Sequence, residues 1–340
     1  MTSSPRARRA VLLLVALAGA LVVLVLGSAG PARAQGVGSE RVGTSAGNFL
    51  KIGVGARAVG MGEAFVAVAN DPSTVYWNPA GVASIIRREV AVSHVEWPAD
   101  IKVDHIAYIL PMKKLGGSFG IHLGMVHTDI AQTTSDQPFG TGRTLTYSDW
   151  DAGVTYGRRL TDRLLVGVGA KVVHEDFGTD VGGPAANSWL VDLGSIYYLG
   201  ISSVRIGMAL SHFGPDLQPS GTFTSATGEQ RAYDNFSPPT TFRFGVAWEP
   251  IEHEHQRLTT SVEFNQPSDN QLVAKAGAEF ELDDRFAIRT GYNVNADEMK
   301  WSSGAGFYPT FGTTRGTFDY AFTDGGTLGA VHRFSVGVRF

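Results

Sequence analysis

The chain has 340 residues, with 28 basic and 32 acidic side chains and no cysteine. The absence of cysteine excludes disulfides, thiolate metal sites and a lipid-modified N-terminal cysteine. The first 34 residues carry four of the basic groups and none of the acidic ones, so residues 35–340 have 24 basic and 32 acidic groups and a net charge of −8. Such an acidic chain is a poor candidate for nucleic-acid binding. We expect no nucleic-acid partner and no cofactor.

The N-terminus has the pattern of a secretory signal peptide. Three arginines within residues 6–9 precede an apolar run over residues 10–26, and small residues occupy both peptidase-recognition positions in Ala32-Arg33-Ala34. We therefore expect residues 1–34 to be a signal peptide that is cleaved before Gln35. The apolar run is long for a signal core, which leaves an uncleaved membrane anchor as the alternative. Paired arginines alone are weak evidence for twin-arginine export.

Residues 49–83 form a segment that is rich in glycine and alanine and poor in charge. Small residues let backbones approach closely, so the segment is expected to pack inside a larger structure rather than to stand alone in solvent. Asp71 and Pro72 can start a helical turn, with Asp71 as its N-cap and Pro72 in the first position. Asn78-Pro79 is typical of a turn in which the asparagine side chain satisfies a local backbone donor.

Beyond residue 88 the chain alternates with period two. In the last 11 residues, Phe334, Val336 and Val338 alternate with smaller or charged residues. This pattern recurs and predicts about fourteen strands, at 89–97, 103–112, 117–128, 145–159, 163–177, 187–200, 202–213, 239–249, 256–266, 271–282, 285–295, 300–308, 314–324 and 330–340. Charged side chains such as Arg243, Glu263, Lys275, Glu279 and Arg289 should point inward from these strands.

A soluble sandwich would also alternate, so three further features decide between sandwich and membrane barrel. The small face is rich in glycine, aromatic residues fall near the strand ends, and the chain ends on an aromatic within its last strand. If the N-terminus is periplasmic, connections after even-numbered strands are short, whereas 129–144, 178–186 and 214–238 are long connections after odd-numbered strands. We therefore predict an all-β fold, an antiparallel outer-membrane β-barrel of about fourteen strands (residues 89–340) with an N-terminal hatch (residues 35–88) and both termini in the periplasm.

The hatch segment resembles the PorV/PorQ family of outer-membrane proteins, which shares its barrel type with the FadL family. The residues that match are Phe49–Gly53, Gly55–Ala58, Gly60–Gly62, Ala64–Ala67, Asn70–Pro72 and Tyr76–Gly81. Two residues depart from the PorV-like pattern: Glu63 stands where glycine is usual, and Asn70 where aspartate is usual. The resemblance implies a FadL-like barrel, with a hatch motif formed by Gly53, Gly55, Arg57, Gly60, Gly62, Asp71, Asn78, Pro79, Ala80 and Gly81. We interpret this motif as structural, with gating or direct ligand contact as the alternative.

The sequence gives little support for a catalytic site or a metal site. His127 with Asp129, Asp149 with Asp151, and the run His174-Glu175-Asp176 could meet at the rim of the barrel, where a histidine can act as a base. No nucleophile stands out beside them, so an ordinary solvated rim is the simpler interpretation. His253 and His255 could chelate a metal, but no third ligand is evident. We expect no catalytic, cofactor or metal site.

The resemblance to PorV-like proteins implies a docking and shuttle component of type IX-like protein secretion, with secretion-complex proteins and exported cargo as partners. The connection 214–238 and its flanks would then provide contact residues, namely Phe213, Leu217, Phe223, Tyr233 and Phe236, unless this loop folds over the barrel mouth. The alternative is a FadL-like channel for hydrophobic compounds, whose partners are a hydrophobic small molecule and outer-membrane lipid. A channel needs an apolar pocket between hatch and loops, whereas a docking barrel needs an exposed apolar loop surface. A surface enzyme is the third interpretation.

Overall fold

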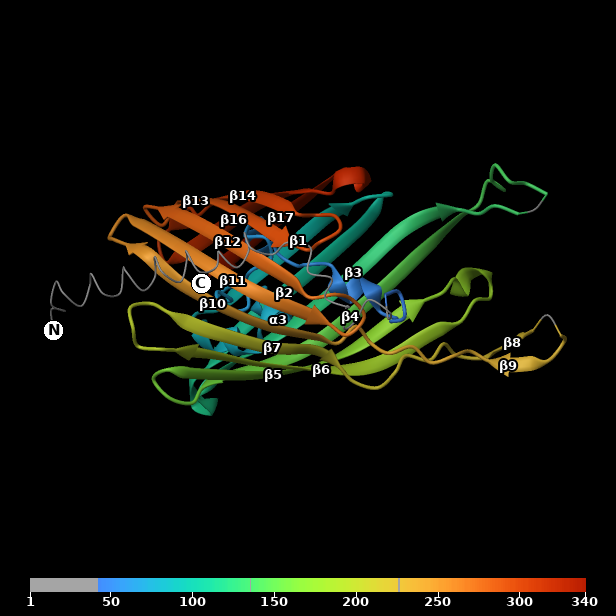
Figure 1. The fold of residues 1–340 in the computed structure, drawn as a ribbon, viewed down its shortest axis with the longest axis horizontal. Helices are drawn as coiled ribbons and strands as arrows, with labels where there is room; N and C mark the ends of the chain where they lie inside the picture. Colours follow the sequence, from blue (N-terminus) through green and yellow to red (C-terminus); the bar gives the residue numbers. More distant parts are fainter. Residues whose placement is uncertain (1–41, 135, 226) are drawn as a thin grey trace.

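The computed structural model describes residues 42–134, 136–225 and 227–340 (Figure 1). Within this part of the chain, fourteen long antiparallel strands form one sheet, which the pairs β1–β17 and β14–β16 close into a barrel. The strands are β1 (Glu89–Trp97), β2 (Ile101–Met112), β3 (Gly117–Ala131), β4 (Thr144–Arg159), β5 (Leu164–Asp176), β6 (Ala185–Tyr198), β7 (Arg205–Phe213), β10 (Thr241–Glu252), β11 (Gln256–Pro267), β12 (Val273–Leu282), β13 (Phe286–Val294), β14 (Trp301–Phe307), β16 (Thr314–Asp324) and β17 (Ala330–Arg339). The expected signal peptide, residues 1–34, and residues 35–41 lie outside the described part.

The expectation of about fourteen strands is confirmed, and most strand bounds agree within three residues. The connection before β7 illustrates the differences. Ser202 has a φ of 51°, in the left-handed region that extended strands do not use. This turn delays the start of β7 to Arg205, three residues later than the alternation predicts.

The two faces of the wall differ as the alternation predicts. Phe334, Val336 and Val338 of β17 are exposed on the outer face, whereas Arg333, which directly precedes Phe334, is buried. The charged residues that were expected to point inward are all buried, namely Arg243, Glu263, Lys275, Glu279 and Arg289. An apolar outer belt around a polar interior is the arrangement of a barrel whose outer face contacts lipid. No helix among the described residues is long and apolar enough to span a membrane.

Long and short connections lie at opposite ends of the barrel. The end that we call the loop end carries the connections 132–143, 177–184 and 214–240, which follow β3, β5 and β7. The last of these contains the hairpin of β8 (Thr222–Thr224) and β9 (Gln230–Ala232), which projects beyond the barrel (Figure 1). The other end, the turn end, carries the start of β1, the end of β17 and short connections, with β15 (Thr310–Phe311) paired to β16. Three short 3₁₀ helices, η4 (Lys113–Leu115), η5 (Thr179–Val181) and η6 (Gly326–Leu328), also lie in connections.

The segment before β1 forms a hatch inside the barrel, built from η2 (Asn48–Lys51), α2 (Ala56–Gly60), α3 (Thr74–Trp77) and η3 (Pro79–Ser84). The helical turn expected near Asp71 forms, but the helix begins at Thr74 and Ser73 is its N-cap. Asp71 instead accepts hydrogen bonds from the Ser73 backbone N–H (2.9 Å) and hydroxyl (2.6 Å). The aspartate thus closes the turn that leads into α3 rather than capping the helix itself.

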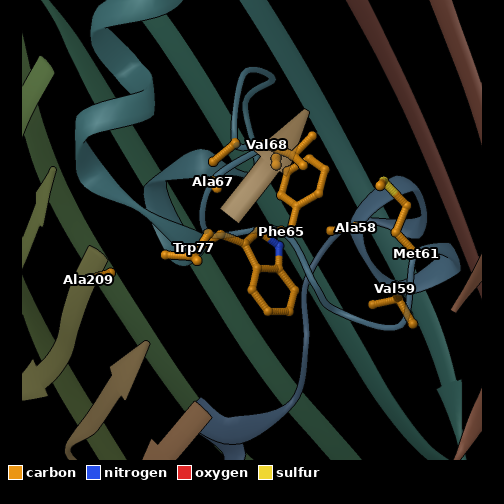
Figure 2. Packing of buried hydrophobic residues seen from close by; sticks show 11 residues of the cluster. Ala58, Val59, Met61, Phe65, Ala67, Val68, Trp77 and Ala209 are labelled. Carbon is orange, nitrogen blue, oxygen red and sulfur yellow. The ribbon is translucent and has the colours of Figure 1, made fainter. Parts of the chain in front are cut away.

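The hatch has its own apolar core. Phe65 and Trp77 are almost fully buried and pack edge to face, with ring centroids 6.3 Å apart. Figure 2 shows these two rings at the centre of a cluster that includes Met61 and Val59, with Ala209 of β7 joining from the wall. The small residues around the rings let a short segment bury two large aromatic side chains, which together stabilise a fold without long helices.

Glycines on the inner face of the wall let the hatch backbone approach closely. Four successive strands contribute Gly157 (β4), Gly167 (β5), Gly194 (β6) and Gly207 (β7). A Cβ atom at Gly167 would lie 2.2 Å from the Pro79 carbonyl carbon, and one at Gly194 would lie 2.1 Å from the Asn78 side-chain oxygen. Real Cβ contacts are never this short, so only glycine admits the Asn-Pro-Ala turn at this part of the wall.

A second group of glycines holds the opposite side of the hatch. Gly62 has a φ of 65°, and a Cβ there would meet the Tyr292 backbone nitrogen at 2.8 Å. Gly277 and Gly291 would in turn collide with Met61 and Gly62 if they carried a side chain. The hatch is therefore braced against β4–β7 on one side and against β12–β14 on the other.

Candidate functional site: the hatch and its two cavities

Asn78 joins three parts of the structure. Its side-chain oxygen accepts a hydrogen bond from the Ala80 backbone (3.1 Å), as the turn pattern predicts. Its side-chain nitrogen donates to the carbonyl oxygens of Val66 (2.8 Å) and Ser195 (3.1 Å). Because Asn78 is fully buried, these bonds are shielded from water, and the residue couples the hatch turn to strand β6.

Arg57 anchors α2 to the wall. Its guanidinium makes a two-pronged contact with Glu279 of β12 (2.8 and 2.7 Å) and also donates to Asn70 (2.6 Å) and Asp71 (3.0 Å). Burial opposes the charge of Arg57, but the nearby Glu279 carboxylate outweighs it and raises the arginine pKa well above its usual value. The planar fork of arginine suits such paired contacts with a carboxylate. Asn70, which stands where the PorV-like pattern usually has aspartate, accepts one of these hydrogen bonds from Arg57.

The structure accounts for the glutamate at position 63, where the PorV-like pattern usually has glycine. Its φ is 62°, in the left-handed region that glycine adopts without cost. Its carboxylate pairs with the buried ammonium group of Lys275 at 2.7 Å. Burial opposes ionisation of Glu63, but Lys275 outweighs it and lowers the pKa of the carboxyl group. The ion pair thus offsets a backbone conformation that ordinarily selects glycine.

A cavity of about 370 Å³ lies between the hatch and one side of the wall, toward the turn end. Small inward residues on adjacent strands create this space, namely Ala91 and Ser93 of β1, Ala107 of β2, Thr317 of β16 and Ser335 of β17. At the turn end its lining is charged, and it includes the pairs Arg339–Glu89 (2.5 Å) and Arg257–Glu281 (2.5 Å). We call this space the turn-end cavity. Its walls combine these polar groups with small apolar residues such as Ala91 and Ala107.

A smaller cavity, of about 30 Å³, lies on the other side of the hatch toward the loop end. We call it the loop-end pocket. Its hatch side is apolar and is formed by Phe49, Leu50, Ile52, Val75 and Tyr76. Its wall side carries the polar residues His105, His122, Asp151, Lys171 and His212 beside the apolar residues Val103, Met125 and Val126. Val54 and His105 line both cavities, so these two side chains lie at the boundary between them.

Most polar side chains on the wall side of the loop-end pocket pair with other residues of the wall. His122 bonds to Asp151 (2.9 Å) and stacks on His105 with ring centroids 5.7 Å apart. Lys171 contacts both carboxylate oxygens of Asp192, at 3.0 and 2.8 Å. An apolar lid facing a compact polar wall can bind a mainly hydrophobic molecule and orient a single polar group.

The structure separates the residues expected to form loop contacts. Leu217 is fully buried in a cluster that includes Leu50 and Leu190, so the 214–240 connection packs over the mouth of the barrel at this point. Phe213 is exposed on the outside of β7. Phe223 and Tyr233 form an aromatic pair in the β8–β9 hairpin, with centroids 5.3 Å apart, and Phe236 pairs with Leu217 through a backbone bridge.

The rim residues considered for catalysis converge only in part. Asp149 is buried and accepts a hydrogen bond from the Asp176 backbone N–H (2.9 Å). Asp151 and Glu175 point inward, and Asp151 is paired with His122. His174 lies on the outer face, where it stacks on Trp150 and bonds to Asn187. Among the described residues, no group of three histidine, aspartate or glutamate side chains is placed to hold a metal ion.

Sequence reasoning missed the residues of the loop-end pocket. One signal was available: Phe49, Leu50 and Ile52 are large and apolar in a segment otherwise made of small residues. The wall histidines gave no such signal: His105 and His122 lie on the paired strands β2 and β3, but His212 lies on β7 and reaches them only across the barrel interior.

One protein-family model matches part of the chain. Residues 26–146 match the model of a family described as "Uncharacterised protein family (UPF0164)". Comparison with curated protein sequences finds no match. The matched region includes the segment on which the PorV/PorQ resemblance rests, but the family description names neither PorV nor PorQ.

Several solved structures have the same architecture. A deletion mutant of the monoaromatic hydrocarbon channel TodX is 14% identical, has a TM-score of 0.56 and covers 84% of this chain and 98% of its own. The Ralstonia pickettii toluene transporter TbuX is 13% identical, with a TM-score of 0.55 and coverage of 84% and 97%. The Pseudomonas putida toluene transporter TodX is 14% identical, with a TM-score of 0.53 and the same coverage. The chain has a FadL-like barrel fold.

Proposed function

We propose that this protein is an outer-membrane channel for hydrophobic compounds, with both termini in the periplasm. The observation that carries this proposal is the loop-end pocket, which is lined by Phe49, Leu50 and Ile52 on its hatch side. Beyond it lies the much larger turn-end cavity, which shares Val54 and His105 with the lining of the pocket. A molecule that enters from the loop end therefore meets an apolar binding surface, a narrow barrier and then a roomier space.

The way in which the hatch is braced agrees with this route. Glycines hold it against β4–β7 and β12–β14, whereas small side chains leave space along β16, β17, β1 and β2. Movement of the hatch into this space would widen the barrier and keep the glycine contacts, at the expense of the hydrogen bond from the Ala56 N–H to the Ser335 hydroxyl of β17 (2.9 Å). The likeness to hydrocarbon channels supports the fold for such a role.

A docking role in type IX-like secretion is the second candidate. The observation that favours it is the projecting β8–β9 hairpin with its partly exposed Phe223–Tyr233 pair, since exposed aromatic residues can anchor a partner. Burial of Leu217 over the mouth weighs against it, because this residue is then unavailable for contact. Capture of an exported cargo protein that is lost on Phe223→Ser would support docking, whereas unchanged capture would reject a role for this hairpin.

We do not assign an enzymatic role. The rim histidine His174 lies on the outer face, whereas the carboxylates Asp149, Asp151 and Glu175 lie on the inner face, where Asp151 is already paired with His122. A general base must reach its substrate through a hydrogen bond, and this arrangement provides no shared position for one.

The test of the channel proposal uses purified protein in liposomes and radiolabelled toluene. Because the chain has no cysteine, Val54→Cys introduces a single thiol at the barrier between the cavities. We expect saturable uptake that falls when this thiol carries a bulky reagent. Val42→Cys, at an exposed position outside both cavities, is the matched control and should tolerate the same label. Uptake equal to that of protein-free liposomes would reject the channel, and an unaffected labelled Val54→Cys would reject the route.

A further inference from the structure

A β-bulge in β7 turns a histidine into the loop-end pocket. The register between β6 and β7 shifts between Val191 and Leu193. Ser211 and His212, which are consecutive, are both almost fully buried on the inside, whereas the next residue, Phe213, is exposed on the outside. Bulges of this kind re-aim side chains and are common next to functional sites.

His212 adopts an uncommon backbone conformation to reach this position. Its φ is 61°, which costs free energy for a residue with a side chain, although histidine tolerates it better than most. The Asp192 carboxylate holds the bulge by accepting the His212 backbone N–H at 2.7 Å. A strained backbone conformation and the buried Asp192 carboxylate thus hold the His212 imidazole inside the barrel.

The imidazole held in this way has no hydrogen-bond partner among the described residues. Neither ring nitrogen of His212 makes a hydrogen bond, with the Asp192 Oδ1 atom 4.0 Å from Nδ1, and Nδ1 of His122 also makes none, although all three nitrogen atoms are buried. Both rings line the loop-end pocket. A neutral imidazole offers one donor and one acceptor, so the two rings together present the pairing capacity that a hydroxyl group can use, since a hydroxyl both donates and accepts.

The surrounding charges disfavour an anionic ligand. The one ammonium group facing the pocket, Lys171, is already engaged by both oxygens of Asp192. A second carboxylate, Asp151, lines the pocket beside His122. The nearby guanidinium group of Arg243 is also engaged, by the Ser211 hydroxyl (2.9 Å) and the ring of Tyr76. A ligand carboxylate would therefore meet the carboxylates of Asp151 and Asp192 and cations that already have partners, and like charges in a low-dielectric site repel strongly.

We propose that the loop-end pocket selects hydrophobic compounds that carry one neutral hydroxyl group, which hydrogen-bonds to His212 and His122. The proposal rests on the channel function and names the substrate class of the same pocket. The cavity of about 30 Å³ holds a group the size of a hydroxyl or a water molecule. The apolar body of the ligand lies against Phe49, Leu50 and Ile52, which must move to admit an aromatic ring.

The test measures binding to the detergent-solubilised protein by titration calorimetry, independently of transport. The probes are 4-ethylphenol, ethylbenzene and 4-ethylbenzoate, which share one apolar body and differ in the polar group. We expect 4-ethylphenol to bind about fivefold more tightly than ethylbenzene, the factor that corresponds to about 1 kcal/mol of hydrogen bonding, and 4-ethylbenzoate to bind most weakly.

Variants identify the residue responsible. His212→Phe keeps a ring and removes both nitrogens, so it should abolish the preference for 4-ethylphenol. His212→Asn tolerates the left-handed backbone and keeps a polar group, so it should retain part of the preference. His174→Phe, which changes a histidine on the outer face, should leave it unchanged. Heat-dependent gel migration checks that each variant forms a closed barrel.

Equal affinity for 4-ethylphenol and ethylbenzene, tightest binding of 4-ethylbenzoate, or a preference that survives His212→Phe would each overturn the proposal. Uptake of the same probes into liposomes is measured separately. Absence of uptake together with a His212-dependent preference would reject the channel function and leave the binding site standing. Uptake of all probes without this preference would retain the channel and reject the hydroxyl selectivity.

Discussion

Addition of one methyl group to the wall at Gly167 tests how the hatch is held. A Cβ atom there would lie 2.2 Å from the Pro79 carbonyl carbon and 2.4 Å from the Ala80 nitrogen, whereas ordinary contacts begin at 3.4 Å. The Asn-Pro-Ala turn must therefore move by about 1.2 Å, because the colliding atoms are backbone and cannot rotate away. Overpacking of this kind costs about 1–3 kcal/mol, and the shift would also stretch the bond from Asn78 to Ser195.

Gly169→Ala is the matched control for Gly167→Ala. Both glycines lie on β5 and face inward, but a Cβ at Gly169 would approach only the Thr155 hydroxyl at 3.3 Å and Asp192 atoms at 3.5 Å. We expect Gly167→Ala to lower the temperature of the heat-dependent gel shift by several degrees, at about 2–4 °C per kcal/mol, and to increase leakage of a small polar solute from liposomes. Identical behaviour of the two variants would refute the idea that the close glycine contacts fix the hatch.

Three further predictions concern the hatch and the loop above it. Asn78→Ala should destabilise the protein by about 1–3 kcal/mol, because two buried carbonyl groups and the Ala80 N–H lose their partner. The temperature of the heat-dependent gel shift measures this loss, and an unchanged temperature would contradict it. The lowered pKa of Glu63 means that its ion pair with Lys275 stabilises the fold above the ordinary glutamate value of 4.5 and that this contribution is lost as the pH falls through the lower folded pKa. Acid titration of thermal stability should therefore lose this component in Glu63→Gln, and an unchanged acid limb would argue against the pair. Leu217→Ala should lower the local stability of the loop by about 2–5 kcal/mol, as expected for truncation of a core side chain. The loosened loop over the barrel mouth should then speed toluene uptake, whereas slower uptake would contradict a covering role.

The wall could be predicted from the sequence because its signals are local. Alternation places Phe334, Val336 and Val338 on one face and Arg333 on the other without reference to any other strand. The glycine content of the inner face likewise signals close packing of the hatch. Glu63 shows the limit of such reasoning: its departure from glycine could be noted from the sequence, but its positive φ and its partner Lys275 required the fold.

The site could not be predicted because it depends on register and on contacts between distant parts of the chain. The bulge that turns His212 inward has no period-two signature, since it breaks the alternation in which Ser211 and His212 would face opposite sides. The 214–240 connection could equally have projected or folded inward, and burial of Leu217 on the hatch depends on Leu50, which is far away in sequence. The turn-end cavity results from small residues on two pairs of consecutive strands, β1–β2 and β16–β17, which become neighbours only when β17 pairs with β1.

Uptake by living cells tests the central claim most directly. The initial rate of toluene uptake is compared between cells that produce the protein and cells that lack its gene, over a range of toluene concentrations. The account predicts a saturable component only in producing cells, and its loss when a thiol at Val54→Cys carries a bulky label. Identical rates in both strains, with the barrel present and folded in the outer membrane, would contradict a channel for hydrophobic compounds.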